Sequence, residues 1–236
     1  MQIAGYLKTS LIEWPGKIVS VVFTPGCNFR CPFCHNADLV DPLKIKKLPV
    51  ISANEVLADL KKRRKWVDGV TVTGGEPTLQ KDLPEFLKKT GDLGFLRMIH
   101  TNGSNPDMIA QLFNCSIVDY VCLDVKGDFG GYEKFTKIQN SKFKIQNSIE
   151  TIIRSGVEYE FRTTVVPGLH DLKNLISLAE QIKSLVQSCR WFLQQFRPTN
   201  CLDKSYLKIE PYSQEEMKNF QKELQKIIPN VSLRGI

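Results

Sequence analysis

The amino-acid sequence predicts an α/β protein built on a parallel sheet. Apolar, β-prone runs alternate with helix-like segments along the whole chain, which gives six strand–helix units. Each unusual cluster of Cys, Gly, Asn or Asp follows a predicted strand, as expected where functional groups occupy the loops at one edge of such a sheet. The sheet is either doubly wound or curved into a partial barrel. The 236 residues, 42% of them hydrophobic, can bury one core, so we expect a single domain over 1–236.

Six runs rich in β-branched and aromatic residues predict the strands. The first of them is followed by an unusually long connection, which in a compact domain usually signals function. The predicted strands are Val19–Thr24, Gly69–Thr73, Phe95–Thr101, Asp119–Val125, Tyr159–Val166 and Trp191–Phe196.

Helix-start signals lie between these strands. Ser52 and Glu55 form a capping box, Asp82 can cap the next helix, and Pro106 suits the first turn of the one after it. We therefore expect helices over 52–65 and 82–89, from 106 onward, and over 143–155, 171–188 and 213–228.

Composition and charge limit the possible partners. The formal net charge is +7, but the densest basic run, Lys61–Lys65, ends a predicted helix, where cations suit the negative end of the dipole. No aromatic single-strand platform or zinc-finger spacing accompanies it, so we expect no nucleic-acid partner. The first residues lack the layout of a signal peptide, and no apolar run is long enough for a membrane helix. We expect a cytoplasmic protein whose seven cysteines are reduced.

Three cysteines and a histidine share the loop after the first strand, namely Cys27, Cys31, Cys34 and His35. The last three match the pattern of covalent haem attachment, but Cys27 would then have no role. A redox pair of Cys31 and Cys34 would normally lie at a helix start. Zinc could use all four side chains, although the adjacent Cys34 and His35 would be hard to direct at one tetrahedral centre.

An iron–sulfur cube needs three thiolates at three corners, which a short loop with this spacing can supply. Its fourth iron would lack a local cysteine, and an open metal position is typical of a site that binds substrate. The spacing CxxxCxxC, with Phe33 directly before the last cysteine, resembles the signature of the radical S-adenosylmethionine superfamily. The resemblance implies a partial (β/α)6 barrel, one 4Fe–4S cluster bound by Cys27, Cys31 and Cys34, and S-adenosylmethionine as second cofactor.

The loop after the second strand strengthens this resemblance. Gly74-Gly75-Glu76-Pro77 looks like the GGEP motif that receives the amino group of S-adenosylmethionine in that superfamily. Glycines let the backbone approach a ligand closely, and a carboxylate can offset a cationic group. The resemblance therefore implies that Gly74, Gly75 and Glu76 bind the cofactor.

Further motifs resemble activating enzymes of glycyl-radical proteins, and within these the anaerobic ribonucleoside-triphosphate reductase activating proteins. The similarity extends over nearly the whole chain, at Lys8–Lys17, Cys34–Asn36, Thr101–Ser104, Asp124–Lys126 and Val166–Gly168. It implies that Phe33, His35 and Asn36 lie beside the adenosine, that Lys126 meets the methionine carboxylate and that Asp124 binds ribose or a nearby cation. The same resemblance adds four more cofactor-binding residues, namely Thr101, Asn102, Arg162 and Val165.

One position departs from the related activating enzymes of pyruvate formate-lyase. These often carry an acidic residue directly before the Thr-Asn-Gly stretch, where this chain has His100. An imidazole cannot replace a carboxylate as ligand of a hard cation, so a monovalent-cation site is in doubt here. We expect His100 either to hydrogen-bond ribose or to pack at the strand end.

The other four cysteines are scattered. Cys122 lies within a predicted strand and should be buried, whereas Cys115, Cys189 and Cys201 could be partly exposed. No ferredoxin-like insert is present, which favours a single cluster.

The implied activity is reductive cleavage of S-adenosylmethionine to a 5'-deoxyadenosyl radical, which then generates a glycyl radical on a partner enzyme. No side chain needs to act as acid or base. The implied partners are an anaerobic ribonucleotide reductase and an electron donor such as flavodoxin. The alternatives are an activator of pyruvate formate-lyase, a radical enzyme acting on a small molecule, such as a deazapurine-forming ring contractase, and a zinc-stabilised nucleic-acid-binding domain.

Overall fold

The computed structural model describes residues 1–186 and 188–236. Its eight strands form one sheet in the order β1 to β8, so each strand lies beside its neighbours in sequence. The pair β1–β2 is antiparallel and all the following pairs are parallel. The strands are β1 Gly5–Ser10, β2 Val19–Thr24, β3 Gly69–Gly74, β4 Leu96–Thr101, β5 Tyr120–Asp124, β6 Glu158–Val165, β7 Trp191–Gln195 and β8 Val231–Arg234.

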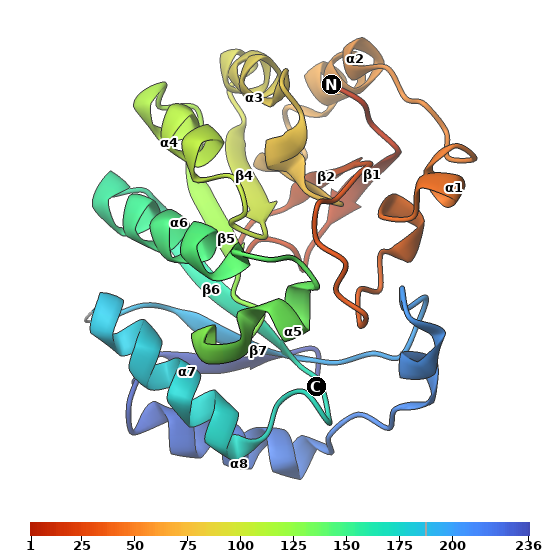
Figure 1. Cartoon of the computed structure of the whole chain (residues 1–236). Coiled ribbons are helices and arrows are strands. Elements are labelled where there is room, and N and C mark those ends of the chain that lie inside the picture. The colour runs from red at the N-terminus through yellow and green to blue at the C-terminus, as the bar shows by residue number, and fades with distance from the viewer. Residues whose placement is uncertain (187) are drawn as a thin grey trace.

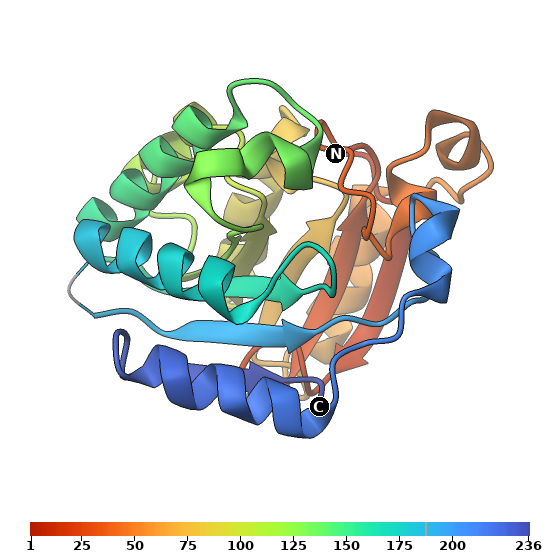
Figure 2. The ribbon, with the colours of Figure 1, turned by 60° about the horizontal axis from the view of Figure 1, so that its bottom comes forward.

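Most of the helices cover the outer side of the curved sheet, whereas the short helix α1, Pro42–Ile45, projects from the connection between β2 and β3 (Figures 1 and 2). They are α1 Pro42–Ile45, α2 Ala53–Arg63, α3 Leu83–Asp92, α4 Pro106–Asn114, α5 Tyr132–Thr136, α6 Ser141–Ser155, α7 Leu172–Leu185 and α8 Gln214–Gln225. Among the described residues, no helix is both long and apolar enough to cross a membrane.

The six predicted strands are all present as β2 to β7, and the parallel α/β architecture is confirmed. Two strands were not predicted. β1 adds an antiparallel edge, and β8 adds a short parallel strand at the other edge.

One helix-start prediction is wrong in its mechanism. Asp82 precedes α3, but its side chain makes no capping hydrogen bond there. Its carboxylate instead pairs with the amino group of Met1. The capping box of Ser52 with Glu55 and the position of Pro106 in the first turn of α4 are confirmed.

Two hydrophobic clusters fill the two sides of the sheet. The larger lies mainly between the sheet and the helices, which pack fully buried side chains such as Leu60, Leu87 and Leu178 against it. The smaller lies inside the curve, where Trp14 from the β1–β2 connection packs against Tyr120 with ring centroids 5.4 Å apart. Because Tyr120 begins β5, Trp14 closes the interior near the start of the strands and leaves their other ends free for a site.

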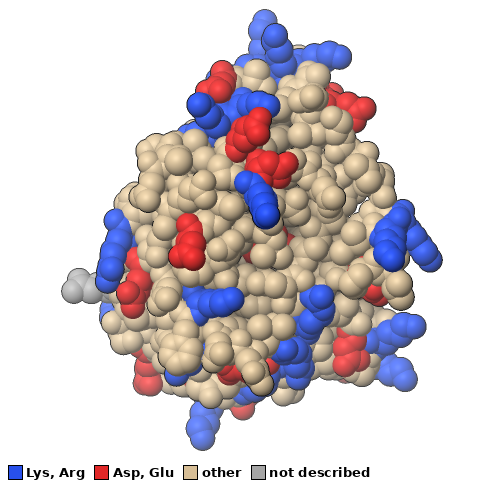
Figure 3. Space-filling view, turned by 45° about the horizontal axis from the view of Figure 1, so that its top comes forward, with Lys and Arg blue, Asp and Glu red and all other residues tan. Residues whose placement is uncertain are grey.

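On the face shown in Figure 3, Lys and Arg side chains form several separate groups, with acidic residues between them. The densest basic run begins in the last turn of α2, at Lys61–Arg63, and continues past the end of the helix to Lys65. Next to it the indole of Trp66 is 73% exposed.

Candidate active site

A cavity of about 600 Å³ lies at the carboxyl ends of the strands. Its wall combines the loops after β2, β3, β4 and β5 with side chains of β6 and β7. Among the predicted site residues, Val165 does not line the cavity and packs in the core instead. The cavity brings together all the others: Cys27, Cys31, Phe33, Cys34, His35, Asn36, Gly74, Gly75, Glu76, Thr101, Asn102, Asp124, Lys126 and Arg162.

The three cysteines of the loop after β2 lie in one wall of this cavity. The Cys27 sulfur accepts a hydrogen bond from the Phe29 N–H at 3.4 Å and one from the Asn102 amide at 3.6 Å. Burial raises the pKa of Cys27 and of Cys31 to about 12, and it raises the pKa of Cys34 as well. Without metal the three groups are therefore neutral thiols.

The chemistry of these donors fits an iron–sulfur cube. Three sulfur ligands on a single loop can each reach a separate iron of a cube. Within the described residues, no three His, Cys, Asp or Glu side chains gather around one point closely enough to hold a single metal ion. A cube does not require such convergence, because its cysteines bind at different corners.

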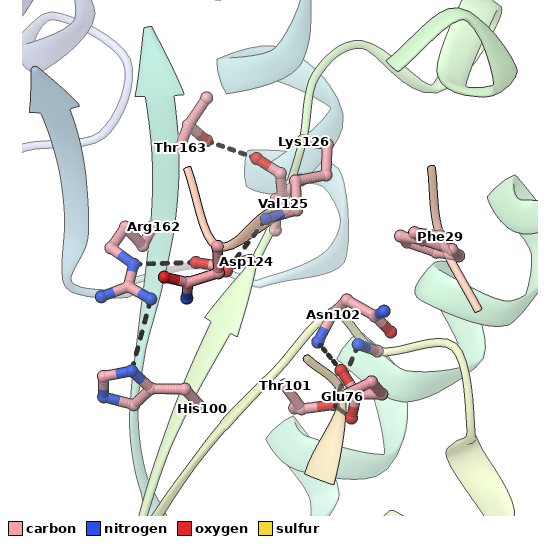
Figure 4. Close-up of polar contacts among 12 residues, drawn as sticks. Phe29, Glu76, His100, Thr101, Asn102, Asp124, Val125, Lys126, Arg162 and Thr163 are labelled. Atoms are coloured by element: carbon pink, nitrogen blue, oxygen red, sulfur yellow. Dashed lines mark hydrogen bonds and ion pairs between the residues drawn. The ribbon is translucent and has the colours of Figure 1, made fainter. Parts of the chain in front are cut away.

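Glu76 joins the loops after β3 and β4 (Figure 4). Its carboxylate accepts hydrogen bonds from the N–H and hydroxyl of Thr78 at 3.1 and 2.6 Å, from the Thr101 hydroxyl at 2.7 Å and from the Asn102 N–H at 2.7 Å. The side chain is only 1% exposed, and burial raises its pKa against the opposing effect of these four donors. Glu76 therefore fixes the cavity wall, in addition to any contact with a ligand.

Gly75 allows the β3 loop to lie directly against the start of the cysteine loop. A Cβ atom at this position would lie 2.0 Å from the carbonyl oxygen of Gly26. The neighbouring Glu76 N–H donates to that same carbonyl at 2.7 Å. The glycine is thus required by close backbone packing, whatever ligand the cavity holds.

A charged network lines the opposite wall (Figure 4). Asp124 at the end of β5 accepts from Lys126 Nζ at 2.9 Å and from Arg162 Nε at 2.8 Å. Burial by itself would raise the pKa of Asp124, but the two cations outweigh it and hold that pKa well below its usual range. Burial would likewise lower the pKa of Lys126, and Asp124 reverses this effect. All three groups are therefore charged at neutral pH.

His100 extends this network. Its Nδ1 atom lies 3.4 Å from an Arg162 nitrogen and 3.9 Å from a Glu13 carboxylate oxygen. Its Nε2 atom is buried and has no hydrogen-bond partner among the described residues. Burial and then Arg162 lower the pKa of His100 well below its usual value, so the ring is neutral and accepts through Nδ1. The ring is 5% exposed, which agrees with the expected packing at the strand end.

Several residues near the cavity were not predicted. Glu13 reaches it from the β1–β2 connection, and Arg234 reaches it from β8. Arg234 binds the fully buried Glu160 of β6 through two contacts of 2.6 and 3.2 Å. Glu13 belongs to the Lys8–Lys17 stretch, but the resemblance gave it no role. No local motif marks Arg234, which enters the site because β8 pairs with β7.

A comparison with protein families matches residues 21–179 to the Radical SAM superfamily. The chain belongs to the radical S-adenosylmethionine superfamily. The cofactors of this superfamily are a 4Fe–4S cluster and S-adenosylmethionine, as the sequence predicted.

Among curated relatives, this radical S-adenosylmethionine protein is 33% identical to a candidate glycyl-radical enzyme activating enzyme of Methanocaldococcus jannaschii, over 99% of this chain and 96% of the relative. It is 30% identical to the pyruvate formate-lyase-activating enzyme of Clostridium pasteurianum, over 92% of this chain and 94% of that one. The expected similarity to activating enzymes is therefore confirmed at the level of this group.

Solved structures share the fold. Streptococcus suis SuiB matches with a TM-score of 0.68 and 16% identity, over 92% of this chain. Escherichia coli coproporphyrinogen III oxidase matches with a TM-score of 0.60 and 13% identity, over 90% of this chain. The chain spans about half the length of both structures, 49% and 52% respectively.

The remaining cysteines partly contradict expectation. Cys122 is fully buried in β5, and Cys115 is exposed. Cys189 and Cys201 are only 6% and 5% exposed, because both face the hydrophobic core. Cys201 lies beside the loop of Cys34, a proximity that the sequence did not reveal.

Proposed function

We propose that this chain is the activating enzyme of a glycyl-radical protein and that its partner is an anaerobic ribonucleotide reductase. One observation carries the chemistry. Three cysteines, a Gly-Gly-Glu turn and an Asp–Lys pair, from three different strand ends, line the same cavity. The similarity to activating enzymes over nearly the whole chain supports the reaction class.

In this proposal Cys27, Cys31 and Cys34 bind the cluster, as deprotonated thiolates. Lys126, held by Asp124, offers a fixed cation to the methionine carboxylate. When bound, the reduced cluster supplies the electron that cleaves the carbon–sulfur bond of S-adenosylmethionine, and the 5'-deoxyadenosyl radical then takes a hydrogen atom from a partner glycine. The protein positions these groups and excludes water, and none of its side chains is required as acid or base.

The adenosine would lie against the cysteine loop. Phe33 is 4% exposed and lines the cavity together with His35 and Asn36. The Asn36 amide donates to the Gly74 carbonyl at 3.3 Å, which joins this loop to the glycine turn. Burial and then Lys126 lower the pKa of His35, so its imidazole is neutral and can both donate and accept a hydrogen bond.

A second partner, pyruvate formate-lyase, is favoured by one finding. The relative from Clostridium pasteurianum is named as its activating enzyme and matches over most of both chains. The proposed electron donor is an acidic flavodoxin, since a formal charge of +7 would steer a negatively charged protein toward this chain.

The test begins with anaerobically reconstituted protein, S-adenosylmethionine and a strong reductant, with iron and sulfide counted in the same sample. We expect 5'-deoxyadenosine and about four irons per chain, the content of one cube. The protein is then mixed with each glycyl-radical enzyme of its own organism, and the glycyl radical is measured by electron paramagnetic resonance. A radical on the reductase supports the proposed partner, and one on pyruvate formate-lyase alone replaces it. Bound zinc without product would overturn the radical reaction.

A further inference from the structure

The segment that follows β7 returns to the cysteine loop and lies against it. Figures 1 and 2 both show the chain near residue 200 beside the segment that follows β2. The Leu202 N–H donates to the Cys34 carbonyl at 3.1 Å, and the Asp203 N–H donates to the Pro32 carbonyl at 2.9 Å. A third contact joins the Asn200 amide to the Asp38 carboxylate at 3.1 Å.

These contacts hold the second half of the cysteine loop, which makes no other backbone hydrogen bond to a distant segment within residues 1–186 and 188–236. The first half of the loop has other anchors: the Gly26 carbonyl accepts from Glu76, and the Arg30 N–H donates to Thr136 at 2.8 Å. In the part of the chain that the structure describes, Leu202 and Asp203 provide the backbone hydrogen bonds between Pro32–Cys34 and any other element.

The segment itself is well anchored at both ends. Phe196, just before it, is 1% exposed in the core, and Tyr206, just after it, packs against the same core. Asn200 adopts the left-handed conformation with φ of 49°, which asparagine tolerates better than most residues. Cys201 is 5% exposed and packs in the hydrophobic core.

We propose that residues 199–203 form a brace that positions Cys34, and with it the second half of the cysteine loop, for cluster binding. The inference rests on the proposed ligation by Cys27, Cys31 and Cys34. Ordering a free loop costs conformational entropy when a ligand binds, and a loop that is already held avoids this cost. The brace would therefore slow the loss of iron by keeping Cys34 in place after its thiolate detaches from the cluster.

The chain offers specific tests of the brace. Leu202→Pro and Asp203→Pro each delete one donating N–H group. Lys204→Pro is the matched control, because Lys204 begins a short 3-10 helix and its N–H makes no intrahelical bond there. The preceding Asp203 already has extended backbone angles, φ −94° and ψ 118°, which a following proline requires.

The first measurement is the rate at which anaerobically reconstituted protein releases iron to a chelator. We expect release to be about three- to tenfold faster in Leu202→Pro, the effect of losing one hydrogen bond, and unchanged in Lys204→Pro. Release should be at least as fast in Asp203→Pro, which also loses the two hydrogen bonds that the Asp203 carboxylate accepts from Ser205. Wild-type rates in both brace variants would overturn the proposal. Equal acceleration in all three variants would also overturn it, since proline itself would then be the cause.

A second measurement uses the wild-type chain and so does not depend on how the variants fold. Amide hydrogen exchange of the cluster-free protein should show the Leu202 and Asp203 amides protected, together with the Cys34 amide, which donates to the Cys31 carbonyl at 3.1 Å. Free exchange of the two amides would refute the brace. Neither measurement depends on S-adenosylmethionine cleavage, so a protein that keeps its cluster but makes no 5'-deoxyadenosine would contradict the proposed function and leave the brace intact.

Discussion

His170 is a buried imidazole whose protonation should destabilise this protein. It is 2% exposed, and its Nδ1 atom accepts a hydrogen bond from the Val166 N–H at 3.1 Å. Its Nε2 atom lies 2.9 Å from the Lys126 carbonyl, to which it therefore donates. The ring also stacks on Phe135 at 5.0 Å. Each ring nitrogen of the neutral imidazole therefore makes one hydrogen bond. A proton added to Nδ1 would point at the Val166 N–H and break the bond between them.

The size of the effect follows from the pKa of this imidazole. Burial lowers it from 6.5 to about 4, although the two backbone contacts oppose the change. Between these values the unfolded chain binds the proton more readily, so stability is complete above pH 6.5 and is lost as the pH falls toward 4. A shift of this size corresponds to roughly 3 kcal/mol in the free energy of unfolding.

The assay is urea unfolding of cluster-free protein at several pH values from 4.5 to 8, for the wild type and for His170→Gln. The variant should be less stable at pH 8, because its hydrogen bonds to Val166, to Lys126 or to both are weaker than those of the imidazole. Its stability should nevertheless fall less than that of the wild type as the pH is lowered. The difference between the two curves removes the contribution of carboxylates that titrate in both proteins. Parallel curves would refute the argument, as would a nuclear magnetic resonance titration that shows His170 protonating near pH 6.5 in the folded chain.

Three further predictions concern the site. Cys31→Ala should lose the cluster and all cleavage of S-adenosylmethionine, measured as iron content and 5'-deoxyadenosine; a variant that still cleaves would contradict the cluster assignment. Lys126→Ala should keep its iron but bind S-adenosylmethionine about tenfold more weakly in equilibrium dialysis, the effect of losing a charged hydrogen bond, whereas the exposed Lys144→Ala should bind normally. Gly75→Ala should destabilise the chain by about 1–3 kcal/mol in thermal unfolding, because the new Cβ atom would overlap the Gly26 carbonyl. The control Gly131→Ala should be nearly neutral, because a Cβ atom at position 131 would have no neighbouring atom closer than 3.5 Å.

The strands that were predicted are those whose signal is local. Val19–Thr24 and Tyr120–Asp124 are runs of β-prone residues, and their burial in a parallel sheet makes the signal continuous. β1 escaped prediction because half of its residues are exposed at the sheet edge, and β8 because it has only four residues. Edge strands bury little, so their sequences carry little of the pattern on which prediction depends.

The site was predicted to a similar extent and for similar reasons. Cysteine spacing and the Gly-Gly-Glu turn are local patterns, and both reach the cavity as expected. Val165 is the exception, since alternation along β6 directs it to the core and Arg162 to the cavity. The role of Glu76 as a junction between two loops could not be inferred, because its partner Asn102 is separated from it by 26 positions.

The sequence alone determined the alternation of strands and helices, the superfamily and the loops that carry the chemistry, because these depend on residue type and short spacing. The tertiary structure decided which distant groups meet. It paired Arg162 with His100, Arg234 with Glu160, and Leu202 with Cys34. Such contacts depend on the curvature of the sheet and on where each connection returns, and these are properties of the packed chain as a whole rather than of any short segment.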